Sequence, residues 1–353
     1  MDDKKINLSS LLLSYFIKYD RMLQMVEYSL GDASCNVIDV YIDLYDILKP
    51  IYTTAVFANS KFLIVSSMIN LAAHIREYFR SRHRLYTRIY LVYGASITTQ
   101  HKLFHPTFGD DAFRQTVNYE KNHSFIQSQL QLLQILCGYI PDVYYIKRDA
   151  DFSMFAYDNI IKNDPNIPVI ILTKSKYVYQ IPAILPHVKI FRPKKHLGVD
   201  SSYVVSTPYV FGTLYSKISN EQTLSYLSRI NPALCSAMMS ITGLPSYGIN
   251  SVMNVTTASK NVYSAIVNNQ IVNDYNSDIN HLYNNLPELQ KKIDAVSFAN
   301  RFKAIDLIYQ HRIYNSTSEA RDITWYINLD DPQTIKEINN KYFIDDPLDL
   351  NSL

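Results

Sequence analysis

The chain has 353 residues, of which 47% are hydrophobic and 19% charged, and its formal net charge is +2 at pH 7. A chain of this length can bury a sizeable core in one large domain or two. A charge this close to zero excludes a global field that would draw the whole protein onto nucleic acid or a membrane. Three widely spaced cysteines, Cys35, Cys137 and Cys235, exclude a disulfide framework or a zinc knuckle and indicate free thiols in a reducing compartment. The charged start Met1–Lys5 excludes a signal peptide, and the apolar run Leu11–Ile17 is too short to span a bilayer.

The first part of the chain alternates between helical and strand patterns. Apolar residues spaced near 3.6 predict helices, and short runs of β-branched and aromatic residues predict buried strands. In chain order we expect a helix over 7–30, a strand at 35–42, a helix at 60–79, a strand at 88–93, a helix at 123–136, a strand at 142–147, a helix at 151–161 and strands at 168–172 and 187–191. This alternation predicts an α/β domain with a mainly parallel central sheet flanked by helices.

The character of the sequence changes after about residue 215. Polar helical stretches rich in Asn and Ser replace the strand runs, and the tail from Asp330 is acidic. We therefore expect an α/β domain over 1–215, a helical subdomain over 216–330 and an acidic tail over 331–353.

Short motifs occur along this scaffold in a definite order. They are VID at 37–39, RIYLVYG at 88–94, YEKNH at 119–123, SQLQLLQIL at 128–136, DADF at 149–152, SKYVYQI at 175–181 and a stretch at 233–248 that ends in GLPSYG. Their order and spacing resemble those of the flap endonuclease family of 5′→3′ exonucleases, over residues 35 to about 265. The resemblance implies a PIN-like 5′-nuclease fold, with a degenerate helical-hairpin DNA-binding motif in the C-terminal subdomain.

The resemblance also implies a depleted metal site, because these nucleases use two divalent ions held by carboxylates. The family positions that keep an acid are Asp39, Asp149 and Asp151, which become residual metal ligands for at most one weakly bound Mg²⁺. From the residues alone, Asp39 could instead end a strand, and Asp149 or Asp151 could cap the next helix. The acid is replaced at six further family positions: Gly94, Phe152, Ser175, Tyr177, Ser236 and Met239. We therefore expect no functional catalytic residue.

A run of arginines is a candidate for contacts with nucleic acid. Arg76, Arg80, Arg84 and Arg88 recur every four residues, so a helix that continued through all four would carry a cationic stripe able to neutralise phosphates. The alternative is a solvated helix end, where arginines complement the helix dipole.

Two further segments are candidates for contacts with a DNA backbone. Residues 192–196 are expected in a loop after a strand, where Lys194 and Lys195 either contact phosphates or lie in solvent. The resemblance implies that Gly243 and Gly248, in the hairpin, contact duplex backbone through their main chain.

These observations leave three hypotheses about function. The first is a catalytically inactive 5′-nuclease-like protein that acts as a structural or DNA-handling component. The second is a divergent, metal-dependent nuclease that is still active, and the third is an assembly subunit with no DNA role. A composition rich in Tyr, Asn, Ile and Lys, whose codons are A/T-rich, favours a phage or other virus as the source. We thus expect non-specific DNA and proteins of a viral assembly as partners, no membrane, and a location in the cytoplasm of an infected host cell or in the virion.

Overall fold

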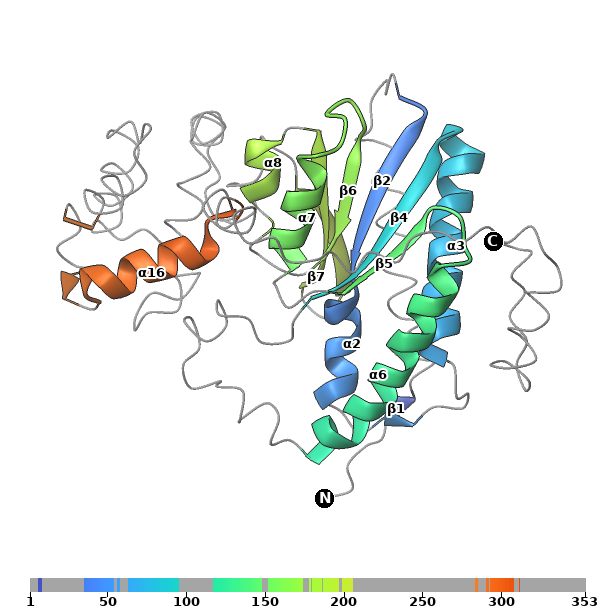
Figure 1. Ribbon diagram of the computed structural model, residues 1–353, viewed down its shortest axis with the longest axis horizontal. Helices are drawn as coiled ribbons and strands as arrows, with labels where there is room; N and C mark the ends of the chain where they lie inside the picture. The colour runs from blue at the N-terminus through green and yellow to red at the C-terminus, as the bar shows by residue number, and fades with distance from the viewer. Residues whose placement is uncertain are drawn as a thin grey trace.

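A six-stranded sheet forms the centre of the molecule (Figure 1). The computed structural model describes residues 6–7, 35–53, 56–57, 63–94, 117–147, 152–173, 178, 180–185, 187–196, 199–205, 283–284, 290–291, 293–307 and 311. The sheet strands are β2 (Val37–Asp43), β4 (Tyr86–Tyr93), β5 (Val143–Lys147), β6 (Val169–Leu172), β7 (Val188–His196) and β8 (Val199–Val205). The helices are α2 (Leu44–Thr53), α3 (Leu63–His83), α6 (Val117–Cys137), α7 (Phe152–Ile160), α8 (Gln180–Ile184) and α16 (Ala295–Ile305). The short strands β1 (Ile6–Asn7) and β3 (Val56–Phe57) pair separately.

The sheet is mainly parallel, as the sequence predicts. Its spatial order is β5-β4-β2-β6-β7-β8, and every pairing from β5 to β7 is parallel. Strand β8 closes one side of the sheet in antiparallel register with β7. Counted along the chain, the order is 3-2-1-4-5-6, which is that of doubly wound α/β sheets. The chain therefore builds outward from β2 in one direction, then returns and continues in the other direction from β6.

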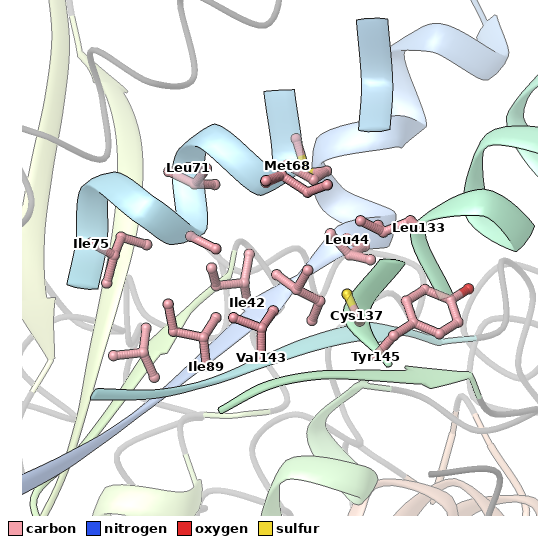
Figure 2. Close-up of a cluster of buried hydrophobic side chains, with 14 of the residues drawn as sticks. Ile42, Leu44, Met68, Leu71, Ile75, Ile89, Leu133, Cys137, Val143 and Tyr145 are labelled. Carbon is pink, nitrogen blue, oxygen red and sulfur yellow. The ribbon is translucent and has the colours of Figure 1, made fainter. Parts of the chain in front are cut away.

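One face of the sheet carries the main hydrophobic core. Ile42 of β2, Ile89 of β4 and Val143 of β5 point toward α3, whose Met68 and Leu71 cover them (Figure 2). Helices α2 and α6 complete this layer, and their core residues include Leu44, Leu133 and Cys137. Because side chains alternate along a strand, the residues between these apolar positions must lie on the opposite face. Asp39, Tyr41 and Asp43 of β2 consequently share that second face.

The structure corrects several boundaries and one element type. Helix α3 ends at His83, four residues later than predicted, and β2 continues to Asp43. The prediction of a loop for the basic segment 192–196 is wrong, because this segment belongs to β7 and pairs with β8. The sequence pattern missed this because Pro193 and the adjacent lysines are weak strand formers, whereas the antiparallel pairing with β8 is a tertiary contact. The helix expected over 7–30 lies outside the described residues, except for Asn7 in β1.

Helix α16, from the distal part of the chain, packs on the α/β domain through α8. It begins at Asp294, whose carboxylate accepts a hydrogen bond from the Ser297 N–H at 2.8 Å, as an N-cap does. At its other end, the buried Gln180 amide donates to the Ile305 carbonyl at 2.9 Å and accepts from the Leu307 N–H at 3.1 Å. The side chain of one residue of α8 thus satisfies two main-chain groups at the end of α16. Among the described helices, none is long and apolar enough to cross a membrane.

Candidate functional site

The strand order identifies one edge of the sheet as the place where a ligand would bind. In open α/β sheets, ligands bind outside the carboxyl ends of the strands, where the winding direction switches. Here that switch lies between β2 and β6, which are parallel neighbours. Strand β2 ends at Asp43 and β6 ends at Leu172, directly before Thr173.

Two carboxylates and one hydroxyl meet at this switch point. The Thr173 hydroxyl lies 2.7 Å from Asp43 Oδ2 and 3.1 Å from Asp46 Oδ2, and Asp46 lies in the first turn of α2. The main-chain N–H of Asp46 also donates to Asp43 Oδ1 at 3.3 Å. A hydroxyl has a single proton, so it can donate to only one of the two carboxylates at a time. Two negatively charged groups therefore converge on one polar side chain, and Asp43 is almost wholly buried.

Aromatic residues lie at the carboxyl end of β4 and at the start of α7. Strand β4 ends at Tyr93, which is buried and followed by a buried Gly94. The ring of Tyr45, from α2, packs edge-on against Tyr93 with the ring centres 6.4 Å apart. Phe152, the first residue of α7, is only 3% exposed. Gly94 and Phe152 are thus two of the positions where the resemblance places an acid, and both are buried in the packed structure.

Asp39 lies on the first strand of the sheet but away from its carboxyl edge. It lies in the first half of β2 rather than at its carboxyl end, and its side chain is fully buried. Arg88 of β4 donates hydrogen bonds to both carboxylate oxygens, from Nε to Oδ1 at 2.6 Å and from Nη2 to Oδ2 at 2.8 Å. The side-chain amide of Asn163, just beyond α7, donates a hydrogen bond to Oδ2 at 3.1 Å. Because the Arg88 guanidinium contacts both of its oxygens, Asp39 already has a cationic partner, and its role as a metal ligand stays a prediction.

The electrostatics of this pair are set by burial and by the pairing itself. Burial raises the pKa of Asp39 above its ordinary value, and the bonds from Arg88 and Asn163 act in the opposite direction. Burial also lowers the pKa of Arg88, but the bonds to Asp39 outweigh it and raise that pKa overall. Each partner therefore stabilises the charge of the other against the cost of burial.

The four arginines do not form one helical stripe. Arg76 and Arg80 lie one turn apart on α3, but the helix ends at His83, and Arg84 follows it with a positive φ of 55°. Arg88 lies on β4 with its guanidinium engaged by Asp39. The premise of a continuous helix is therefore wrong, because the chain must reverse at Arg84 to enter the sheet. Nucleic-acid binding by these arginines stays a prediction.

Most other predicted site residues lie outside the described part of the chain. This holds for Asp149 and Asp151, for Gly243 and Gly248, and for four vacated family positions: Ser175, Tyr177, Ser236 and Met239. For Lys194 and Lys195 only the main chain is described, in β7. Within the described residues, no group of three or more His, Cys, Asp or Glu side chains is arranged to hold a metal ion.

The position of Asp43 in the sequence indicates a site residue that the motif comparison does not include. The sequence pattern predicts a strand over 35–42, which stops one residue before Asp43. A buried strand that ends in Asp, directly before a helix, places that acid at the carboxyl edge of a parallel sheet. Thr173 has the same relation to β6, but its closeness to Asp43 follows from the pairing of β2 with β6, which the sequence does not show.

Comparison with known proteins gives a distant likeness among solved structures. No protein-family model and no curated protein sequence matches the chain. Among solved structures, the chain is similar to T5 5′-exonuclease with bound divalent zinc ions, at 11% sequence identity and a TM-score of 0.42. That match covers 80% of this chain and all of the other.

Proposed function

We propose that this protein is a 5′-nuclease-like, DNA-handling component that binds the nucleic-acid backbone at the carboxyl edge of its sheet without cutting it. The observation that supports it most is the convergence of Asp43, Asp46 and Thr173 at the switch point. Carboxylate and hydroxyl oxygens suit a hard divalent cation, and Mg²⁺ commonly binds to one or two carboxylates while substrate phosphates complete its shell. The donor set therefore fits one cation.

The chemistry of such a site is limited to what these residues can do. Asp43 and Asp46 would hold the cation, which supplies positive charge against a phosphodiester oxygen. Thr173 donates its proton to a carboxylate and so fixes the orientation of the pair. The buried aromatic rings of Tyr93 and Phe152 fill space near this edge and add no carboxylate to it. Their presence favours backbone binding over two-metal hydrolysis, which uses metal ions ~3.5–4 Å apart.

The experiment measures cation binding and DNA cleavage on matched variants. Titration with Mn²⁺, followed by electron paramagnetic resonance, should show one bound ion per chain in the unaltered protein. Asp43→Asn should weaken binding at least about tenfold, whereas Glu77→Gln, the loss of one exposed carboxylate on α3, should leave it unchanged. Equal effects of the two substitutions, or no binding at all, would refute the proposed cation site.

A second function, a still-active metal-dependent nuclease, is favoured by one feature of the chain. In the sequence, Asp149 and Asp151 lie between Lys147, the last residue of β5, and Phe152, the first residue of α7. Incubation with 5′-flap and single-stranded DNA in Mg²⁺ and in Mn²⁺ decides between the two. Turnover that Asp43→Asn abolishes would establish the active nuclease and reject the non-cutting role.

The proposal also includes four expectations from the sequence: a viral source, partners in a viral assembly, a location in host cytoplasm or virion, and a domain boundary near residue 215. A protein that neither binds a cation nor associates with DNA would favour the assembly subunit with no DNA role.

A further inference from the structure

The chain that follows α16 contacts the α/β domain through polar groups at two helices. At α8, where the C-terminal end of α16 arrives (Figure 1), the Gln180 side chain is bonded to the main chain of Ile305 and Leu307. At α7, His311 Nδ1 lies 2.8 Å from Asp158 Oδ1. The partners Gln180 and Ile305 are 125 positions apart in the sequence, and Asp158 and His311 are 153 apart. Residues 305–307 and His311, the return segment, thus join distal chain to both helices.

Helix α7 is buried on more than one side. All of its residues except Asn159 are buried, which is typical of a helix that is covered all round rather than on one face. Asn159 donates to the Tyr41 hydroxyl of β2 at 2.6 Å, so this side of the helix faces the sheet. The preceding residue, Asp158, instead meets His311, and the Tyr157 ring packs edge-on against the His311 ring with centres 5.7 Å apart. The return segment therefore covers a side of α7 that the sheet does not.

The contact at α7 is built around a buried charge. Asp158 is 3% exposed, and its second carboxylate oxygen accepts a hydrogen bond from Lys162 Nζ at 2.9 Å. A carboxylate taken out of water in this way is stable only with polar partners. Since His311 supplies one of these partners, burial of Asp158 and docking of the return segment favour each other.

The contact at α8 lies close in the chain to the proposed cation site. Thr173, whose hydroxyl meets Asp43 and Asp46, begins the connection that ends at Gln180, the first residue of α8. Within and just after this connection, Val178 and Ile181 are fully buried. A short connection that is packed along its length has few torsions with which to absorb a movement of α8. A shift of α8 should therefore reach Thr173.

We propose that docking of the return segment on α7 and α8 regulates the cation site. When the segment is docked, it holds α8 in place and keeps Thr173 against Asp43 and Asp46. When the segment is released, Thr173 moves and the site loses affinity for its cation. This inference rests on the proposed cation site and adds its regulation. Because coupling between two binding events is reciprocal, a bound cation must also stabilise the docked segment by the same factor.

The test measures Mn²⁺ affinity of the full chain by electron paramagnetic resonance, with one variant at each contact. His311→Phe keeps a ring against Tyr157 but removes the contact with Asp158, and Gln180→Ala removes the bonds to Ile305 and Leu307. Each variant should weaken Mn²⁺ binding at least about fivefold, the lower end of typical coupling between sites. Val296→Ala is the control, because it trims a side chain of α16 that is 69% exposed, and it should leave Mn²⁺ affinity unchanged.

Amide hydrogen exchange supplies a second measurement that a purely structural role would not change. Saturating Mn²⁺ should slow exchange in residues 295–307 of the unaltered protein at least about fivefold and leave exchange in α3 unchanged. Folded variants that exchange faster in residues 295–307 yet bind Mn²⁺ normally would refute the regulation and leave the cation site intact. Unchanged exchange in both variants would also refute it, since these contacts would then not hold the segment. If the unaltered protein bound no Mn²⁺, the cation site itself would be rejected, and its regulation with it.

Discussion

Replacing Arg88 by Met tests the role assigned to the Asp39–Arg88 pair. The substitution keeps the length of the aliphatic stem but removes both charge-assisted bonds to a fully buried carboxylate. Breaking a buried ion pair in this way costs about 3–5 kcal/mol, because one charge stays buried without its partner. Since Arg88 is 27% exposed and Asn163 still donates to Asp39, we expect a loss near the lower limit, about 3 kcal/mol.

The loss of stability caused by Arg88→Met should increase with pH. In the unaltered protein, burial already raises the pKa of Asp39, and Arg88 counteracts this. Without Arg88 the folded-state pKa of Asp39 rises further above the unfolded value, so the folded variant binds the proton more tightly than the unfolded chain. Its stability is then greatest below the unfolded pKa and falls as the pH rises through the raised folded pKa. The free-energy difference between the two proteins should consequently be larger at pH 7 than near pH 4.

The assay is urea unfolding followed by circular dichroism at both pH values, with the double variant Asp39→Asn, Arg88→Met as the control. Removing both charges leaves no buried unpaired ion, so the double variant should be more stable than Arg88→Met at pH 7. This account would be contradicted if Arg88→Met lowered the free energy of unfolding equally at both pH values, or if the double variant were no more stable than Arg88→Met.

Two further predictions follow from the packing. Gln180→Ala removes the buried hydrogen bonds to the Ile305 carbonyl and from the Leu307 N–H. Amide hydrogen exchange in residues 295–307 should therefore accelerate by an amount that corresponds to about 2–4 kcal/mol, while exchange in β2 stays unchanged. Unaltered exchange in α16 would show that Gln180 does not stabilise this helix. Burial raises the pKa of the Cys137 thiol, so a disulfide reagent followed by peptide mass mapping should label the partly exposed Cys35 first, and Cys137 only when the protein unfolds. Labelling of Cys137 at the rate of Cys35 under native conditions would contradict the packing of α6.

Much of the fold follows from the sequence because its signals are local. Near-continuous apolar runs such as that in β6, where all four side chains are buried, can only be satisfied by a sheet covered on both sides. The alternation of such runs with helical periods therefore predicts a parallel α/β sheet without knowledge of which strands pair. Element ends were less well defined, as the extension of α3 to His83 shows, because a helix end depends on the turn that follows it.

The candidate site was decided by tertiary structure. From the sequence, Asp39 was the acid of the first strand and Arg88 was one member of a cationic run, and nothing local joined them. Register places Arg88 directly beside Asp39 across β2 and β4, and the low dielectric of the sheet interior favours their pairing over exposure of either charge to other partners. The pairing of β2 with β6 likewise brings Thr173 to Asp43 across 130 positions of sequence. Residue types and spacings determined which elements form, whereas strand order and register determined which side chains meet, since contacts between distant segments depend on the whole chain being folded.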